Sequence, residues 1–229
     1  MRWTYFLFDL DNSLFYIPDP SKYFDKILSD TINKLSDNKI PSREERNKFW
    51  LSGNDYVKLL RNWGIHDYDE FWEHFDSIDF TYRKEYIPDG KMKLYEDVEL
   101  VLKKLKEKGE NRLAIVSNTA EYIVDFILDK FEINHFFDIV FALGSENEQE
   151  MAKPSPAGIH YVLKNMNFNH NVSDAIMIGD SIVDIFAAKR ANITACLLTR
   201  ALNKYPEGYD KWEHKPDYIV KNLDEILLL

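Results

Sequence analysis

Residues 3–14 read Trp-Thr-Tyr-Phe-Leu-Phe-Asp-Leu-Asp-Asn-Ser-Leu, an apolar run followed at once by two carboxylates. On a continuing strand, Asp9 and Asp11 would lie on the same side. Two like charges that close together repel each other unless a cation lies between them. Packing alone does not explain such a pair at the end of a buried strand. The stretch therefore predicts a metal-binding and catalytic position.

The composition predicts a globular protein with a large core. The chain has 229 residues, of which 45% are hydrophobic, and its formal net charge is −10. A negative balance argues against nucleic acid or an anionic membrane as a partner. The single cysteine, Cys196, lies in an apolar run and is predicted to be a buried hydrophobe. Because the first apolar run ends at Asp9, it is too short for a signal or membrane segment, so we expect a cytoplasmic protein.

Short apolar runs alternate with helical patterns in the outer parts of the chain. The predicted strands cover residues 3–8, 113–116, 139–143, 175–178, 195–198 and 218–220. The predicted helices cover residues 96–108, 120–131, 156–166 and 183–191. Short apolar strands separated by helices are typical of a parallel sheet that is covered on both faces. The predicted fold class is a doubly wound α/β domain.

Residues 16–88 break this alternation, because they contain helical patterns and no convincing strand. Apolar residues at helical spacing predict helices over 20–35, 55–63 and 70–78. Ser42, with Glu45 three residues later, fits a capping box that opens another helix. We interpret residues 16–88 as an all-helical insertion. The expected domains are a core of residues 1–15 and 89–229 and a helical cap of residues 16–88.

Polar side chains follow four of the predicted strands. Asp9 and Asp11 follow the first, Ser117 and Asn118 the second, Lys153 comes after the third, and Asp180 and Asp184 follow the fourth. In a parallel sheet these positions share the carboxyl edge, where doubly wound folds bind ligands. Together they provide carboxylates, a hydroxyl, an amide and an ammonium. That set suits phosphoryl transfer to a carboxylate nucleophile with a hard cation such as Mg²⁺.

In this order the motifs resemble those of the haloacid dehalogenase-like hydrolase superfamily, over essentially the whole chain. The family's Asp-x-Asp-x-Thr/Val motif matches Asp9-Leu10-Asp11-Asn12-Ser13, and its strand-end Ser or Thr matches Ser117. Its Lys before a helix matches Lys153, and its Gly-Asp-x-x-x-Asp motif matches Gly179-Asp180-Ser181-Ile182-Val183-Asp184. Two positions depart from the pattern. Ser13 replaces the usual Thr, and Asn12 stands where many relatives have Gly.

The position of the insertion resembles that of members with a helical cap after the first motif, such as phosphoglycolate phosphatases and pyrimidine 5′-nucleotidase-like enzymes. The resemblance implies that Asp9 attacks phosphorus and carries an aspartyl phosphate. It implies that Asp11 protonates the leaving alkoxide and then activates water. The implied cofactor is Mg²⁺, bound by the Asp9 carboxylate, the Asp11 backbone carbonyl and Asp180.

The remaining motif residues have implied roles around the phosphoryl group. Lys153 and Ser117 would hold its oxygens, and Asn118 completes this phosphate-binding set. Asp184 would support the metal site or fix Lys153, and Ser13 would orient its neighbours. The implied reaction is Mg²⁺-dependent hydrolysis of a small phosphomonoester.

Two other functions compete with this interpretation. A metal-free 2-haloacid dehalogenase would also use Asp9 as nucleophile, but it needs no acid for an alkoxide, so Asp11 argues against it. A non-enzymatic phospho-aspartate receiver lacks a helical insertion after the first strand. A degenerate relative that only binds its ligand is a further alternative, but every catalytic position of this chain is occupied by a competent residue. The expected partner is a small phosphorylated metabolite, with phosphoglycolate, sugar phosphates and nucleoside monophosphates as candidates. The sequence leaves open whether the protein is a monomer or a homodimer. We expect that residues 16–88 and the flanking loops, including 199–216, select the substrate.

Overall fold

The computed structural model describes residues 3–229 apart from 51, 145–147, 170–173 and 201–207. The chain divides into two compact units. The core unit comprises Met1–Tyr16, Leu94–Gly144 and Met151–Leu229, and the second unit comprises Ile17–Lys93 and Ser145–Glu150. The action of the second unit as a cap stays a prediction.

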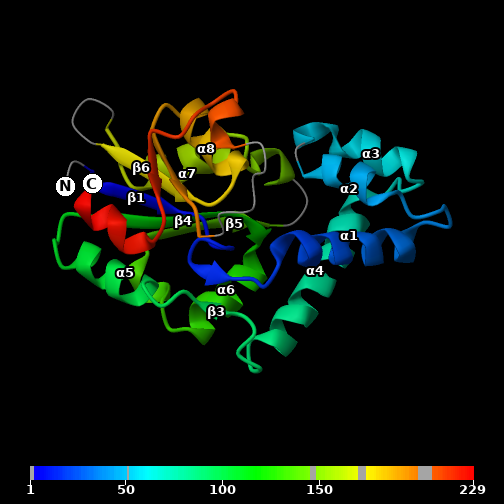
Figure 1. Cartoon of the computed structure of the whole chain (residues 1–229), viewed down its shortest axis with the longest axis horizontal. Coiled ribbons are helices and arrows are strands. Elements are labelled where there is room, and N and C mark those ends of the chain that lie inside the picture. The colour runs from blue at the N-terminus through cyan, green and yellow to red at the C-terminus, as the bar shows by residue number, and fades with distance from the viewer. Residues whose placement is uncertain (1–2, 51, 145–147, 170–173, 201–207) are drawn as a thin grey trace. The chain divides into compact units, whose positions relative to one another are not determined.

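The core unit contains a six-stranded parallel sheet with the order β5-β4-β1-β6-β7-β8 (Figure 1). The strands are β1 (Tyr5–Phe8), β4 (Arg112–Ala120), β5 (Ile139–Leu143), β6 (Ala175–Gly179), β7 (Thr194–Leu198) and β8 (Tyr218–Val220). The first strand lies in the interior of the sheet, where Phe8 is in register with Ile115 of β4 and Ile178 of β6. This register places the ends of β1 and β6 side by side, next to Ile115 of β4, and Asp9 follows β1.

Helices cover both faces of the sheet, which confirms the doubly wound α/β prediction (Figure 1). They are α5 (Val98–Lys106), α6 (Glu121–Lys130), α7 (Ala157–Asn165) and α8 (Ile182–Arg190). In one core cluster, Ile159 of α7 and Ile185 of α8 pack with Leu7 and Met177 of the central strands. Short 3₁₀ helices lie at Asn134–Phe136, Glu148–Met151, Tyr209–Lys211 and Leu223–Leu228. Cys196 is fully buried in β7, as predicted, and burial raises the pKa of its thiol to about 12.

The second unit is built from helices. They are α1 (Pro20–Leu35), α2 (Arg43–Phe49), a 3₁₀ turn (Gly53–Asp55), α3 (Tyr56–Asn62) and α4 (Tyr68–Tyr86). Helix α2 begins with the predicted capping box, in which Ser42 Oγ accepts from the Glu45 amide. Where the chain passes between the units, two short strands, β2 (Phe15–Tyr16) and β3 (Lys93–Leu94), pair with each other.

Helix α4 extends eight residues past the predicted end at residue 78. The prediction missed this part because the buried face of the helix contains charged residues there. Arg83 and Asp79 are almost fully buried, and Arg83 Nε donates to Asp79 Oδ1 at 2.9 Å. The Tyr23 hydroxyl of α1 donates to the same carboxylate. An ion pair inside the helix packing interrupts the apolar pattern on which the prediction rested, so the predicted boundary was wrong.

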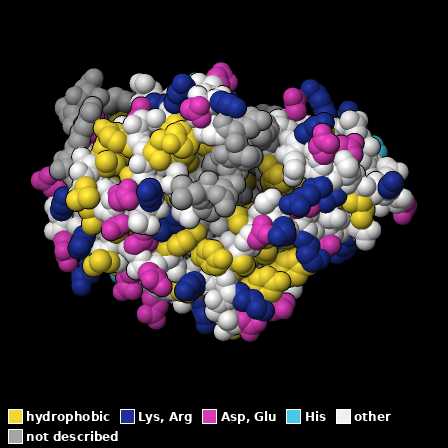
Figure 2. All heavy atoms as spheres, in the orientation of Figure 1, with side chains coloured by type: hydrophobic (Ala, Val, Ile, Leu, Met, Phe, Trp, Pro, Cys, Tyr) yellow, Lys and Arg dark blue, Asp and Glu magenta, His cyan; other side chains and the backbone are white. Residues whose placement is uncertain are grey.

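The surface of the molecule is mixed in charge. Figure 2 shows acidic and basic side chains interspersed over the visible face, with apolar side chains between them. Within the part of the chain that the structure describes, no helix has both the length and the apolar character needed to cross a membrane.

Candidate active site

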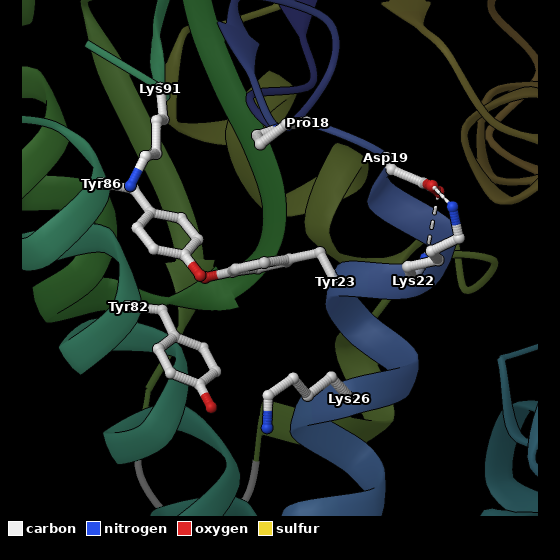
Figure 3. Close-up of a pocket in the computed structure, with 8 residues that line it drawn as sticks. All are labelled: Pro18, Asp19, Lys22, Tyr23, Lys26, Tyr82, Tyr86 and Lys91. Carbon is white, nitrogen blue, oxygen red and sulfur yellow. Dashed lines mark hydrogen bonds and ion pairs between the residues drawn. The ribbon is translucent and has the colours of Figure 1, made fainter. Parts of the chain in front are cut away.

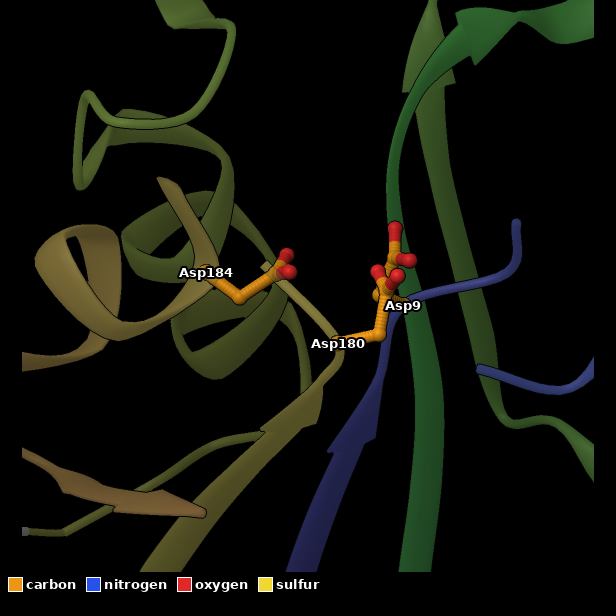
Figure 4. A group of neighbouring side chains, drawn as sticks. All are labelled: Asp9, Asp180 and Asp184. Atoms are coloured by element: carbon orange, nitrogen blue, oxygen red, sulfur yellow. The ribbon is translucent and has the colours of Figure 1, made fainter. Parts of the chain in front are cut away.

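Three carboxylates meet at the carboxyl edge of the sheet. Asp9 follows β1, Asp180 follows β6 and Asp184 lies in the first turn of α8 (Figure 4). One oxygen of each lies within 4.8 Å of the others. The Asp9 amide donates to the carbonyl of Ile178 at 2.9 Å, which continues the sheet pairing one residue past the strand end. Backbone pairing between β1 and β6 therefore fixes Asp9 beside Asp180.

Lys153 provides the positive charge of this site. Its ammonium donates to Asp9 Oδ1 at 2.6 Å, to Asp184 Oδ1 at 2.7 Å and to the carbonyl of Val116 at 2.7 Å. The lysine side chain is 3% exposed, so these contacts are formed out of water. Burial alone would lower the pKa of Lys153, but the Asp184 and Asp9 carboxylates raise it above its ordinary value. The lysine is a fixed cation.

Asn118 holds the backbone of Lys153 in place. The Asn118 amide group donates to the Lys153 carbonyl and accepts from the Lys153 amide, each at 2.8 Å. The two residues are far apart in sequence, so this pair of hydrogen bonds connects the segment before α7 to β4. The Asn118 side chain thus contacts the backbone of Lys153, the lysine that was predicted to bind phosphate, and holds that residue in position.

Ser117 and Asn118 were predicted to follow a strand that ends at residue 116. Strand β4 instead continues to Ala120, with an irregularity in its pairing to β5 between Val116 and Ala120. The polar residues lie in this irregular stretch, whose composition does not read as a strand. Ser117 is buried, and its Oγ accepts from the Thr119 amide at 3.1 Å. Ser117 and Asn118 lie toward the carboxyl end of β4, as predicted, but the predicted end of the strand at residue 116 was wrong.

The turn after β1 carries the rest of the first motif. Asn12 has φ 59°, in the left-handed region where Gly is the usual residue and Asn is tolerated. This backbone conformation explains why Asn stands where many relatives have Gly. The next residue, Ser13, is fully buried, and its hydroxyl donates to Asp9 Oδ2 at 3.3 Å. Ser13 therefore contacts the predicted nucleophile directly.

Asp11 lies outside the three-carboxylate cluster, next to β4. Its Oδ2 accepts from the Thr119 hydroxyl at 2.8 Å. Sequence reasoning missed Thr119, although its place two residues after Ser117 in the same polar stretch was a usable signal. The hydroxyl gives the Asp11 carboxylate a fixed orientation, which a general acid needs.

Asp184 is held at both of its oxygens. Oδ1 accepts from Lys153, and Oδ2 accepts from the Ser181 amide at 2.9 Å and from the Ser181 hydroxyl at 2.5 Å. Gly179 lies directly beside it, because a Cβ at position 179 would come within 2.3 Å of Asp184 Cγ. Glycine is thus required here by close packing, and Asp184 is placed to fix Lys153.

The charge of the site favours a bound cation. Burial raises the pKa of the Asp9 carboxyl to about 8, with Lys153 opposing the shift and Asp184 and Asp180 adding to it. When all three buried carboxylates are ionised, they exceed the one ammonium of this group by two negative charges. A divalent cation would supply that charge and lower the Asp9 pKa. Carboxylate oxygens are the ligands that Mg²⁺ prefers, so these residues fit the ion.

Comparison with known proteins agrees with this geometry. The family model described as haloacid dehalogenase-like hydrolase matches residues 6–198, which includes all four motifs. The chain belongs to the haloacid dehalogenase-like hydrolase family. This confirms the resemblance derived from the motifs and the assignment of the protein as a hydrolase.

Several known proteins are similar to the chain. A phosphoglycolate phosphatase of Colwellia psychrerythraea is 35% identical over 135 residues, which cover 59% of this chain and 56% of that protein. Phosphoglycolate phosphatase 1 of Pseudomonas aeruginosa is 27% identical, with 96% of this chain and 77% of that protein covered. The crystal structure of a predicted phosphoglycolate phosphatase from Haemophilus somnus matches with a TM-score of 0.66. Its sequence is 25% identical, with 100% of this chain and 98% of that chain covered.

The second unit contains a cavity of its own, with a volume of about 360 Å³ (Figure 3). It is lined by Pro18, Asp19, Lys22, Tyr23, Lys26, Tyr82, Tyr86 and Lys91. Lys22 pairs with Asp19, and the Lys91 ammonium lies 5.0 Å from the centre of the Tyr86 ring. The size is that of a small-ligand site, and Lys26 and Lys91 are paired as well, with Asp30 and Asp89.

Proposed function

We propose that this hydrolase is a Mg²⁺-dependent phosphatase that cleaves a small phosphomonoester through an aspartyl phosphate on Asp9. The observation that carries the proposal is the Asp9 carboxylate itself. It is buried at the carboxyl edge of the sheet, held by Lys153 on one oxygen and Ser13 on the other, beside two more carboxylates. A carboxylate that is fixed and surrounded in this way suits nucleophilic catalysis.

In the proposed reaction, an Asp9 oxygen forms a bond to phosphorus while the bond from phosphorus to the ester oxygen breaks. Asp11, oriented by Thr119, gives its proton to the leaving alkoxide. Asp11 then takes a proton from the water that attacks phosphorus, and the bond to Asp9 breaks to release phosphate. The positive charge of Lys153 and the Ser117 hydroxyl stabilise the phosphoryl oxygens, where negative charge develops.

Asp9, Asp180 and the Asp11 carbonyl are the groups that we propose to hold Mg²⁺. When bound, the ion supplies positive charge that lets a carboxylate approach a phosphate dianion. Asp184 serves a different purpose, because both of its oxygens are engaged by Lys153 and Ser181. Its role is to keep the lysine in place.

Two observations favour a phosphatase over a 2-haloacid dehalogenase. Asp11 is present and oriented by a hydroxyl, whereas displacement of halide from carbon needs no such acid. The relatives of Colwellia and Pseudomonas are named as phosphoglycolate phosphatases. Phosphoglycolate is thus the first substrate to test, followed by sugar phosphates and nucleoside monophosphates. The cytoplasmic location and the oligomeric state stay predictions.

The direct test is phosphate release from a panel of phosphomonoesters, measured with the purified protein in the presence of Mg²⁺ and of excess chelator. We expect hydrolysis of at least one small ester with Mg²⁺ and none with chelator. Full activity in chelator would contradict the proposal, and halide release from a 2-haloacid would favour the dehalogenase.

Asp180→Asn should raise the Mg²⁺ concentration needed for half-maximal activity, because the cation loses one of few anionic ligands. The measurement is a Mg²⁺ titration of the rate, with Asp125→Asn on the exposed surface of α6 as control. Ca²⁺ should inhibit, since its looser coordination lets the nucleophilic carboxylate bind side-on. An unchanged Mg²⁺ midpoint in Asp180→Asn would remove Asp180 from the metal site.

Gly179→Ala should cost both stability and activity, because the new methyl group displaces Asp184, which holds Lys153. The expected loss is about 1–3 kcal/mol of unfolding free energy, as for other overpacked positions. Gly158→Ala is the matched control, since its methyl group would meet the Phe141 ring at 2.6 Å. Urea unfolding should show similar losses for both variants, whereas kcat should fall for Gly179→Ala alone. Equal kcat values would show that Asp184 can move without consequence.

We also propose that residues 16–88 select the substrate, because all four motifs lie outside this range. Replacing residues 16–88 by a short linker should weaken discrimination between metabolites, or lower turnover on the best one, while sparing some hydrolysis of an activated aryl phosphate. Circular dichroism and size-exclusion chromatography must accompany the assay, because the change can expose apolar surface. An unchanged substrate ranking would move attention to residues 199–216, of which 201–207 lie outside the described residues.

A further inference from the structure

Arg200 forms a buried ion pair in the core unit, two residues after the end of β7. Its side chain is 5% exposed. The guanidinium binds both oxygens of Asp97, with Nη1 at 3.0 Å and Nη2 at 2.8 Å, and it lies 3.8 Å from the centre of the Tyr95 ring. No motif of the family includes these three residues, and the mechanism proposed above does not use them.

The third contact of this guanidinium leads to the active site. Nε of Arg200 donates to the backbone carbonyl of Ser13 at 2.7 Å. Ser13 is the residue whose hydroxyl contacts Asp9, and it is fully buried. The amides of Leu14 and Phe15 both bind the Leu10 carbonyl at 2.9 Å, so the whole segment is one tight turn. Arg200 thus fixes the turn that carries the first motif.

The same group joins the two segments through which the chain leaves and re-enters the core unit. The chain leaves after Tyr16 and returns at Leu94, and the Tyr95 amide binds the Leu14 carbonyl at 3.0 Å. Asp97 also accepts from the Leu223 amide at 2.7 Å, which anchors it from the other side. The Arg200–Asp97 pair therefore connects the end of the first motif, the returning segment and the C-terminal 3₁₀ helix.

We propose that Arg200 is a positioning residue for the phosphatase reaction: it holds the Ser13 turn, and through it Asp9 and Asp11, in the geometry that the reaction needs. This rests on the proposed function for its kinetic consequence. The planar guanidinium is essential, because it presents Nε to Ser13 while two other nitrogens bind Asp97. A lysine ammonium cannot reproduce this fork.

The test is Arg200→Lys, assayed for kcat and KM with the best ester found for the wild type. We expect kcat to fall about tenfold or more, since small misplacements of reacting groups are costly. KM should change less than about twofold, because Arg200 does not touch the substrate. This split distinguishes positioning from a loss of folded protein, which active-site titration or unfolding curves measure separately.

The second unit offers a close match as control. Arg46 binds both oxygens of Asp25, at 2.7 and 2.8 Å, and donates to the carbonyl of Pro41 at 2.6 Å, with a side chain that is 12% exposed. Arg46→Lys removes the same fork far in sequence from the first motif. We expect a similar loss of stability with kcat unchanged. A normal kcat in Arg200→Lys, or an equal loss in Arg46→Lys, would overturn the proposal.

An activity-independent measurement separates this proposal from the proposed function. Amide hydrogen exchange of a peptide covering residues 10–16 should be faster in Arg200→Lys than in Arg46→Lys, whether or not any ester is hydrolysed. A wild type inactive on every ester would defeat the phosphatase alone, and equal exchange rates would defeat the positioning role. If Arg200→Lys does not fold, Asp97→Asn and its counterpart Asp25→Asn replace the pair under the same criteria.

Discussion

Asp9→Asn should abolish turnover, with kcat lower by about 10⁴-fold or more, as for other enzymes that lose their nucleophile. An amide has nearly the shape of a carboxylate but is a poor nucleophile. Its oxygen can still accept from Lys153, which also keeps its bond to Asp184. The assay is hydrolysis of an aryl phosphate at saturating Mg²⁺.

The same variant should stay folded. Burial already raises the pKa of Asp9 to about 8, so a neutral group at this position costs little. We expect a melting temperature within about 3 °C of the wild type, a shift that corresponds to less than about 1 kcal/mol. Asp125→Asn on the surface of α6 is the control. Substantial residual activity in a folded Asp9→Asn protein would mean that water or another residue attacks phosphorus.

Lys153→Met should damage both stability and catalysis. It leaves Asp9 and Asp184 buried without the ammonium that lies between them. Breaking a buried ion pair on one side costs about 3–5 kcal/mol, and we expect a loss of this size in urea unfolding. The variant should also lose about 10²–10³-fold in kcat, because a charge that faces the phosphoryl oxygens is gone.

Lys106→Met is the matched control for this substitution. Lys106 pairs with Asp138 at 2.8 Å, but its side chain is 30% exposed. Partly exposed pairs contribute about 0–1 kcal/mol, so little stability should be lost. Saturating Mg²⁺ should narrow the stability gap between Lys153→Met and the wild type, because the ion supplies positive charge to the same carboxylates. If Lys153→Met were as stable and active as Lys106→Met, the lysine would have no part in the site.

The sequence predicted that the motif residues share the carboxyl edge of the sheet, because each motif comes after an apolar run that reads as a strand. Strands that are buried on both faces are easily recognised as apolar runs, and in a parallel sheet their carboxyl ends lie at the same edge. The shared position of Asp9, Asp180 and Asp184 at this edge followed from that rule. The boundary of β4 did not, because Ser117 and Asn118 lie in an irregular part of the strand.

Contacts between distant residues that belong to no motif and follow no strand end could not be predicted. The approach of Arg200 to Ser13 and Asp97 spans most of the chain and has no motif. A buried arginine also reads as a surface residue in a sequence, and the same ambiguity concealed the last turns of α4, where Arg83 pairs with Asp79. Charged residues inside the packing are therefore the features that only the structure reveals.

The central claim is that phosphate passes through a covalent bond to Asp9. Its most direct test is a single turnover of a phosphate-labelled ester with Mg²⁺, quenched in acid and followed by peptide mass spectrometry. The account predicts a transient phosphate on the peptide that contains Asp9, absent from the Asp9→Asn protein. Release of labelled phosphate at the full rate, with no labelled peptide at any time point, would contradict it.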